Sequence, residues 1–374
     1  VTSLAAGEIA LITPGDASYS DFDGVPVTKT PEVVPYDTVS VARGGYKHFM
    51  LKEISEQPQA IVATLRGRVS FKPWSVALEN VPFSKTEIMN INRVIFIGMG
   101  TSLHACLIAS RMMEELSGIP SSAENASEFR YRDPIIDSRT LVVSVGQSGE
   151  TADTLSGMEE ASKKGAHTIT VCNAEGSQAT RMADGIIYLK AGPEIGVAST
   201  KTFICSLEAL YILSLYIGST RGHLTDNALG SRITDLTRIP DLLGGLIHNQ
   251  EPYSYLSELY HNKSHFLYLG RGITYPVALE GALKLKEISY IHAEGSPAGE
   301  MKHGPIALID ERMPVVAIAP QDNLQDKMAN NISEVKTRGG TVIAIATEGD
   351  TYIPSLVDHT LYIPKTSFLL TPIV

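Results

Sequence analysis

Short apolar runs alternate along this chain with longer stretches in which apolar residues recur at helical spacing. The apolar runs are rich in β-branched and aliphatic residues and have the length of buried strands. Continuous apolar strands between helical segments are typical of a parallel sheet covered by helices on both faces. The predicted strands are VIFIG (94–98), LVVSV (141–145), TITVCN (168–173), GIIYL (185–189), FLYLG (266–270), VVAIA (315–319), VIAIA (342–346) and TLYIP (360–364).

The order of these elements occurs twice. RVIFIGMGTSLHACLIASRMMEEL (Arg93–Leu116) and HFLYLGRGITYPVALEGALKLKEI (His265–Ile288) each read as a strand, a Gly-x-Gly turn and a helix. Gly98 corresponds to Gly270, and Glu115 corresponds to Glu287, at one offset of 172 positions (270 less 98). An internal repeat of this kind predicts two tandem α/β subdomains, each a doubly wound parallel sheet, packed as a pseudo-dimer.

The repeat divides the chain into five predicted parts. Residues 1–40 contain two segments with strand-like alternation, Glu8–Asp16 and Gly24–Pro31, which are too few to form a core. We interpret them as the trailing edge of a domain that precedes Val1. A helical segment interrupted at Pro58 follows (41–83); then come the first repeat (84–218), a helical connection (219–262) and the second repeat (263–374), whose end inside an apolar segment suggests a missing tail.

Composition narrows the class of protein. The formal net charge of −10 disfavours a nucleic-acid or anionic membrane surface, which would need clustered lysine and arginine. We find no apolar run close to the roughly 18 residues of a membrane span. Cys106, Cys172 and Cys205 lie in apolar segments without a CxxC pair, which is typical of reduced, buried thiols in a cytoplasmic protein. We expect neither a metal nor a cofactor.

Two helix starts in the first repeat carry hydroxyl and amide side chains. GMGTS (98–102) places Thr101 and Ser102 after one strand, and GQSGETADT (146–154) places Gln147, Ser148 and Thr151 after the next. Helix N-termini at the carboxyl ends of adjacent parallel strands favour a phosphate. A nicotinamide dinucleotide is disfavoured, because Leu103 stands where G-x-G-x-x-G needs its third glycine; plain helix capping is the alternative.

The corresponding position in the second repeat reads APQDNLQD. Asp322 and Asp326 stand there where hydroxyl donors would be needed, so we expect a single phosphate site, in the first repeat. PEIGVASTKTF (193–203) follows another strand and introduces a long apolar helix. This segment is either a loop that closes over a sugar or a simple N-cap cluster.

Catalytic candidates lie on the predicted helix Leu279–Ile291. Glu280, Lys284 and Glu287 follow the i, i+4, i+7 spacing and therefore share one stripe of a mostly apolar helix. One interpretation is a solvated ladder of ion pairs. The other is a proton-shuttling Glu287 beside the positive charge of Lys284, as carbonyl migration between two sugar carbons requires. His303, in a Gly-Pro loop, is a candidate general acid and base, or simply an exposed histidine.

GMGTS, QSGETADTL, PEIGVASTK, LEGALKLKEISYIHAEG and GEMKHGP occur in this order and spacing. Together they resemble the isomerase half of the glutamine:fructose-6-phosphate amidotransferases, which consists of two SIS (sugar isomerase) domains. The resemblance covers essentially the whole chain. It implies an enzyme that binds fructose 6-phosphate and converts it, with ammonia from a glutaminase domain, to glucosamine 6-phosphate. Residues 1 to about 37 resemble the end of that glutaminase domain.

The resemblance also assigns residues. It implies that Thr101, Ser102, Gln147, Ser148 and Thr151 hold the phosphate, that Val197 and Ser199 line the sugar, and that Glu280 lies among the substrate-binding groups. Glu287 would transfer the proton between C1 and C2, and Lys284 would assist at the substrate oxygens. The residue matching His303 opens the sugar ring from the neighbouring subunit, which implies a homodimer.

Three departures from the family pattern bear on these expectations. Gly146 stands where the family usually has serine, so one hydroxyl is missing, although we expect its backbone N–H to remain available. The family's tail lysine and its glutaminase domain lie outside these 374 residues. The alternatives are another SIS enzyme, a deglycase or plain phosphosugar isomerase, and a non-catalytic phosphosugar sensor.

Overall fold

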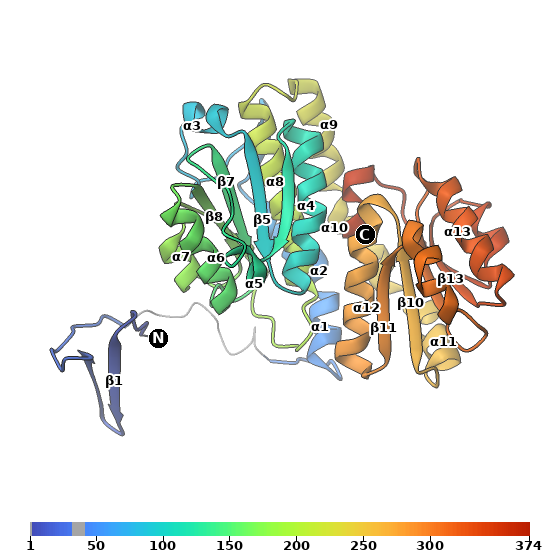
Figure 1. The fold of residues 1–374 in the computed structure, drawn as a ribbon, viewed down its shortest axis with the longest axis horizontal. Coiled ribbons are helices and arrows are strands. Elements are labelled where there is room, and N and C mark those ends of the chain that lie inside the picture. Colours follow the sequence, from blue (N-terminus) through green and yellow to red (C-terminus); the bar gives the residue numbers. More distant parts are fainter. Residues whose placement is uncertain (1, 32–41) are drawn as a thin grey trace. The chain divides into compact units, whose positions relative to one another are not determined.

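The protein is described by a computed structural model that covers residues 2–31 and 42–374. The chain forms two compact units, Val1–Gly44 and Gly45–Val374. Figure 1 gives the elements of both along the sequence. The interpretation of residues 1–40 as one remnant extends into residues 32–40, which lie outside the described part.

The first unit is a β-hairpin. Strands β1 (Glu8–Thr13) and β2 (Asp16–Asp21) pair antiparallel, and a turn at Pro14 and Gly15 joins them. The strand predicted for Gly24–Pro31 is wrong: only an isolated bridge between Ser20 and Pro26 forms there. Proline has no N–H to donate to a ladder, which limits pairing in this segment.

The second unit begins with two short helices that break near Pro58 as predicted. They are α1 (Phe49–Ser55) and α2 (Gln57–Leu65), and Pro58 occupies the first turn of α2, where its missing N–H costs nothing. A small hairpin that the sequence did not reveal follows, formed by β3 (Val69–Phe71) and β4 (Trp74–Val76). Helix α3 (Lys85–Asn90) is closed by a capping box between Ser84 and Glu87.

The first repeat is a five-stranded parallel sheet in the order β6-β5-β7-β8-β9. Its strands are β5 (Arg93–Gly98), β6 (Ser121–Asn125), β7 (Thr140–Val145), β8 (His167–Cys172) and β9 (Gly185–Tyr188). Its helices are α4 (Thr101–Ser117), α5 (Ala126–Phe129), α6 (Ala152–Lys163), α7 (Gln178–Met182) and α8 (Lys201–Thr220). Val94 and Phe96 of β5 face α4 and α8, whereas Ile95 and Ile97 face α5, α6 and α7. The sheet therefore has helices on both faces, as predicted.

The helices α9 (Asp226–Thr237), α10 (Ile239–His248) and α11 (Glu251–Tyr260) connect the repeats. The second repeat has the matching strand order β11-β10-β12-β13-β14, again all parallel. Its strands are β10 (His265–Gly270), β11 (His292–Pro297), β12 (Val315–Ala319), β13 (Val342–Thr347) and β14 (His359–Ile363). Its helical elements are η1 (Gly272–Thr274), α12 (Tyr275–Ser289), η2 (Ala298–His303), η3 (Pro305–Leu308), α13 (Gln325–Thr337), η4 (Ile353–Leu356) and η5 (Phe368–Ile373). The equal strand order confirms the internal repeat and the predicted fold class.

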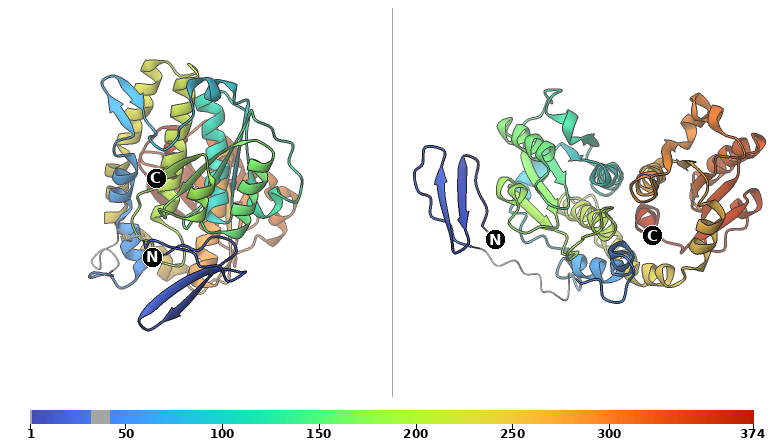
Figure 2. Two further views of the ribbon diagram at one scale, coloured as in Figure 1. Left: turned by 90° about the vertical axis from the view of Figure 1, so that its left-hand side faces the viewer. Right: turned by 90° about the horizontal axis from the view of Figure 1, so that it is seen from below.

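The repeats share part of one hydrophobic core. Leu369, Leu370 and Ile373 of η5, in the second repeat, belong to the same cluster of buried residues as α4 and α8 of the first. Helices α4 and α12 also contact each other directly, and Figure 2 (right) shows them side by side between the two sheets. This contact brings the catalytic candidates of one repeat to the predicted phosphate site of the other.

The expectation that no apolar run approaches the length of a membrane span is wrong for helix α8. Its 20 residues are long and apolar enough to cross a membrane, but 89% of the most apolar stretch is buried inside the protein. Burial also raises the pKa of Glu208, which lies on this helix. The helix is therefore the central core helix of the first repeat.

The three cysteines are unpaired and buried, as the sequence predicted. Burial raises the pKa of the Cys172 thiol to about 11, and it raises the pKa of Cys106 and Cys205 further. These thiols stay protonated at neutral pH and act as small apolar core groups.

Candidate functional site

The predicted phosphate cradle lies at the carboxyl end of two adjacent strands. Strands β5 and β7 pair in parallel, and the chain turns from each into a helix, α4 at Thr101 and α6 at Ala152. Gly100, the residue before α4, has a φ of +52°, a conformation that glycine adopts without strain. The two helix starts therefore lie side by side at the carboxyl end of the sheet, as predicted.

The loop between β7 and α6 is fixed by its neighbour after β8. The Gln147 carbonyl accepts hydrogen bonds from the N–H groups of Asn173 (3.0 Å) and Ala174 (3.2 Å). Gly149 has a φ of +66°, and a Cβ at this position would lie 2.2 Å from the Ser177 hydroxyl oxygen, so glycine alone fits. This anchoring holds the loop of the cradle against the sheet.

A small cavity of about 50 Å³ joins three of the predicted segments. Its lining residues are Thr101, Ser102, Ala105, Gln147, Ser199, Thr202, Phe203 and Ser206. The structure thus brings Thr101, Ser102 and Gln147 together with Ser199 of the loop before α8. Ser148, Thr151 and Val197 lie on the same loops but do not line this cavity.

Gly146 differs from what the sequence led us to expect. Its N–H donates a hydrogen bond to the Val171 carbonyl at 3.0 Å and so continues the pairing of β7 with β8. The expectation that this N–H remains available to a ligand is therefore wrong. Gly146 can offer space to a ligand in this arrangement, but no donor.

Helix α12 begins one turn earlier than predicted and ends at Ser289, because Tyr290 adopts a left-handed conformation with a φ of 61°. Glu280, Lys284 and Glu287 lie along this helix, and their exposure decreases from its carboxyl end toward its middle. The Glu280 side chain is 8% exposed, that of Lys284 19% and that of Glu287 33%. The interpretation of all three as a solvated ladder does not fit Glu280.

Glu280 bonds to helix α4 of the other repeat. Its carboxylate accepts a hydrogen bond from the Thr101 hydroxyl at 2.9 Å and pairs with Nδ1 of His104 at 2.6 Å. Lys284 Nζ lies 3.2 Å from the same carboxylate. Since the single hydroxyl proton of Thr101 is directed at Glu280, Thr101 can donate to a phosphate only if that hydrogen bond is exchanged.

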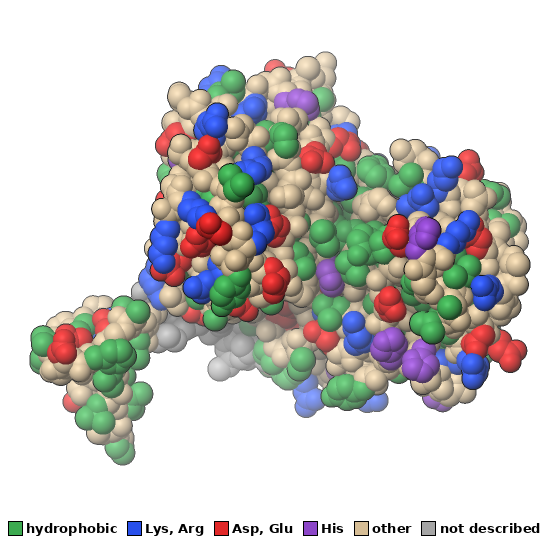
Figure 3. Space-filling model, viewed as in Figure 1, with side chains coloured by type: hydrophobic (Ala, Val, Ile, Leu, Met, Phe, Trp, Pro, Cys, Tyr) green, Lys and Arg blue, Asp and Glu red, His purple; other side chains and the backbone are tan. Residues whose placement is uncertain are grey.

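Lys284 is the central member of this group. Its ammonium donates to the Thr101 hydroxyl at 3.1 Å and to Oε2 of Glu287 at 2.7 Å. One positive charge therefore links the helix start of the cradle to the carboxylate predicted to move the proton. Figure 3 shows apolar side chains gathered on the surface where the two repeats meet.

His303 stands apart from this group. It ends η2 and is exposed, and its neighbour Lys302 pairs with Glu334 of α13 at 2.7 Å. Among the described residues, no hydrogen bond or ion pair joins His303 to Lys284 or Glu287. The role implied for His303, acting from a neighbouring subunit, stays a prediction.

The loop before α8 is closed by its own acidic residue. The Glu194 carboxylate accepts hydrogen bonds from the N–H groups of Thr200 (2.9 Å) and Thr202 (3.2 Å) and from the Thr202 hydroxyl. Ser199 pairs with the Thr202 hydroxyl at 2.7 Å, and Val197 is 91% exposed. Glu194, and not the N-cap residue Thr200, therefore caps the start of α8, and closure of this loop over a sugar stays a prediction.

The sequence analysis missed His104 and Glu194. His104 lies three residues after Thr101 on α4 and so faces the same side, a spacing that could have singled it out. Glu194 precedes the helix by several residues, and only the path of the loop shows that its carboxylate turns back onto α8.

The second repeat has no equivalent open cradle at the start of α13. Asp322 Oδ1 accepts a hydrogen bond from the Leu324 N–H at 2.7 Å. This backbone N–H at the helix start is therefore already bonded to a carboxylate and is not free to bind a phosphate. Burial raises the pKa of Asp322. This arrangement favours a single phosphate site in the first repeat.

Known proteins share this arrangement of two repeats. The SIS domain family matches residues 87–216 and 258–367, one match in each repeat. A protein of Thermus thermophilus named glutamine–fructose-6-phosphate aminotransferase (isomerizing) is 44% identical over 374 residues, which are 100% of this chain and 61% of that protein. A protein of the same name from Aquifex aeolicus is 45% identical, over 99% of this chain and 60% of its own length.

A solved structure agrees with these relatives. The C-terminal domain of glucosamine-fructose-6-phosphate aminotransferase from Francisella tularensis superposes with a TM-score of 0.83 at 39% identity, covering 89% of this chain and 94% of that one. The chain spans about three fifths of the length of the curated relatives above. The similarity therefore concerns their two-repeat part.

Proposed function

This chain belongs to the SIS domain family, and we propose that it is the isomerase part of a glutamine–fructose-6-phosphate aminotransferase. In this proposal it binds fructose 6-phosphate and, with ammonia, forms glucosamine 6-phosphate. The observation that carries the proposal is the bonded series Glu287–Lys284–Thr101, which connects a carboxylate of the second repeat to the phosphate cradle of the first. A protein that only senses a sugar phosphate has no need of a base next to a cation at that position.

The proposed chemistry assigns one task to each group. Ser102, Gln147, Ser148 and Thr151 hold the phosphate, with Thr101 linking the cradle to α12. The backbone at Val197 and the Ser199 hydroxyl line the sugar. Ammonia replaces the C2 carbonyl oxygen, which leaves as water, and gives an imine.

Proton transfer then completes the reaction. Glu287 removes a proton from C1 and returns it to C2, while the C1 hydroxyl loses its proton and the imine nitrogen gains one. The C2–N double bond is thereby replaced by a C1–O double bond, and C2 carries the amino group. Lys284, 2.7 Å from Glu287, stabilises the negative charge that develops on the substrate oxygen. His303 of a neighbouring subunit opens the sugar ring in this proposal.

The proposal extends to the organisation of the whole protein. Residues 1–40 are the end of a glutaminase domain that supplies ammonia, residues 41–83 connect it to the isomerase, and residues 84–218 and 263–374 are the two SIS subdomains. The protein acts as a cytoplasmic homodimer. The relatives' printed names support the assignment as an isomerase part, and the buried, unpaired thiols support the cytoplasmic location.

Isotope exchange tests the activity directly. The protein is incubated with fructose 6-phosphate in D₂O, and deuterium at C1 and C2 is followed by NMR together with glucose 6-phosphate formation. We expect slow isomerisation and exchange. Exchange with tagatose 6-phosphate but not with fructose 6-phosphate would favour another SIS isomerase, and tight binding without any exchange would favour a sensor.

A further inference from the structure

We propose that Glu53 of helix α1 is a positioning residue for the site: it fixes the loop of residues 193–200, which faces the sugar in the function proposed above. This inference rests on that function for the identity of the ligand. Helix α1 lies outside the cavity, and Glu53 would act only through the loop.

The Glu53 carboxylate binds two consecutive backbone N–H groups of the loop. Oε1 accepts hydrogen bonds from Ile195 at 2.6 Å and from Gly196 at 2.9 Å, and Oε2 lies 3.2 Å from the Gly196 N–H. Glu53 is 2% exposed. A carboxylate is buried at high cost unless such donors replace its water.

The fit between Glu53 and the loop is close. A Cβ on Gly196 would lie 2.5 Å from Oε2 of Glu53 and 3.5 Å from the Met50 Cα. A side chain at residue 196 would therefore displace either the Glu53 carboxylate or the loop from this arrangement. Glycine is also the residue that loses most conformational freedom when it is ordered. The hydrogen bonds to Glu53 offset this loss.

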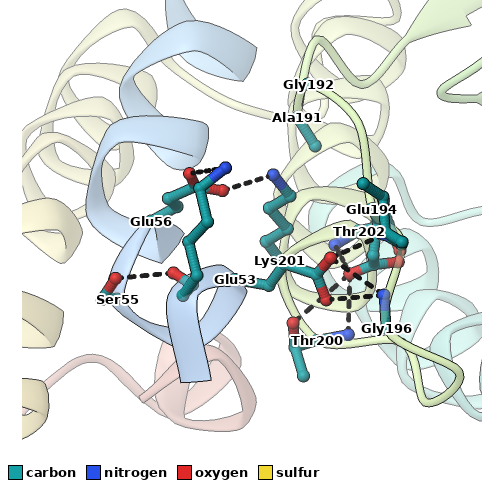
Figure 4. Close-up of polar contacts among 12 residues, drawn as sticks. Glu53, Ser55, Glu56, Ala191, Gly192, Glu194, Gly196, Thr200, Lys201 and Thr202 are labelled. Carbon is teal, nitrogen blue, oxygen red and sulfur yellow. Dashed lines mark hydrogen bonds and ion pairs between the residues drawn. The ribbon is translucent and has the colours of Figure 1, made fainter. Parts of the chain in front are cut away.

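A second contact secures the end of the same loop. Lys201, the first residue of α8, is 2% exposed and donates through Nζ to Oε2 of Glu56 at 2.6 Å. Figure 4 shows Glu53 of α1 and Glu56, which lies between α1 and α2, facing the loop, with Glu194 closing it from within. Carboxylates from α1 and from the loop itself therefore hold the backbone on both sides of Val197.

The consequence concerns the entropy of binding. A loop ordered before the ligand arrives adds no ordering cost when the ligand binds. Without the Glu53 carboxylate, residues 195–199 would have to be ordered by the sugar. Inorganic phosphate needs only the cradle around Ser102 and Ser148, so its binding free energy would not include the cost of ordering the loop.

The first experiment needs no ligand. Hydrogen exchange at the Ile195 and Gly196 amides is compared in the wild type, Glu53→Ala, Glu53→Gln and Glu258→Gln, the last an exposed position on α11. We expect at least about tenfold faster exchange in Glu53→Ala, a smaller change in Glu53→Gln and none in Glu258→Gln. Unchanged exchange in Glu53→Ala would overturn the proposal whatever the substrate is.

The second experiment distinguishes a loss of loop positioning from a general loss of folding or ligand binding. Titration of fructose 6-phosphate and of inorganic phosphate should show fructose 6-phosphate affinity falling about tenfold in Glu53→Ala, with phosphate affinity within about twofold of the wild type. Equal losses for both ligands would overturn the positioning role. If Glu53→Ala does not fold, Gly196→Ala, which pushes the loop away from Oε2, should give the same selective loss.

The two proposals fail differently. If the wild type does not bind fructose 6-phosphate, the function is wrong, and the exchange experiment still tests Glu53. If the wild type binds it and the Glu53 variants bind it equally well, the function stands and the positioning role is wrong.

Discussion

Among the residues that the structure describes, the hydroxyl group of Thr101 has hydrogen-bond partners only from the second repeat, although Thr101 itself belongs to the first. It donates to Glu280 and accepts from Lys284. A phosphate that arrives at the cradle would compete for the same proton, and Lys284 would then be freer to move toward the substrate. In the proposed function, phosphate binding at the cradle and the position of the Lys284 charge would therefore be coupled through the Thr101 hydroxyl oxygen.

Replacing Glu287 with glutamine keeps the size of the side chain but removes the basic oxygen. We expect proton transfer to slow by about 10²- to 10⁴-fold, the range of general base catalysis, with fructose 6-phosphate affinity largely retained. Deuterium incorporation from solvent measures this rate, and Glu311→Gln, an exposed position in the same repeat, is the matched control. Unchanged incorporation in Glu287→Gln would identify another residue as the base.

Removing single hydroxyls from the cradle should weaken binding without abolishing it. Ser102→Ala and Thr151→Ala should each cost about 1–2 kcal/mol of fructose 6-phosphate binding free energy, as expected for one hydrogen bond to a charged group. Isothermal titration measures the loss, with Thr337→Ala on α13 as a control that keeps the cradle intact. Wild-type affinity in both cradle variants would contradict the phosphate placement.

At the scale of elements, one buried carboxylate, that of Glu280, bonds α12 to α4. Glu280→Gln keeps the shape of the side chain but removes the negative charge that faces Lys284 and His104. We expect it to lower the free energy of unfolding by about 1–3 kcal/mol, because charged hydrogen bonds are lost in a buried place.

Urea unfolding measures this difference, and Glu287→Gln on the same helix is the comparison. The pair between Glu287 and Lys284 is more exposed than the one made by Glu280, so its loss should cost less than about 1 kcal/mol. Equal losses in the two variants would mean that Glu280 does not hold the helices together.

Local patterns in the sequence predicted eight of the ten strands of the two sheets, because each of these strands has a continuous apolar run. The missed strands are β6 (SSAEN) and β11 (HAEGSP), which lie at sheet edges and pair on one side only. An edge strand can carry polar residues, so hydrophobic pattern does not detect it. The sequence could place Thr101, Ser102 and Gln147 together because they follow predicted strands, whereas Glu53 lies 142 residues before its partner Ile195 and no local pattern connects them.

At the scale of the whole molecule, the proposed homodimer can be tested by mixing two inactive variants. Neither Glu287→Gln nor His303→Ala should isomerise fructose 6-phosphate at an appreciable rate alone. If His303 acts from the neighbouring subunit, mixed dimers contain one site with both residues intact, and activity should return after subunit exchange. Sedimentation at micromolar concentration checks the dimer itself; no recovery in a mixture shown to contain mixed dimers would mean that His303 does not act across subunits.

The packing of η5 against α8 means that the core around α8 cannot be completed until η5 has been synthesised. Helix α8 is made long before Leu369, Leu370 and Ile373, the residues of η5 that belong to the same buried cluster. At about 5–20 residues per second, the roughly 150 residues between them take on the order of ten seconds to synthesise. Throughout that interval a helix as apolar as a membrane span lacks part of its cover, so the nascent chain should depend on chaperones most strongly while its second half is being translated.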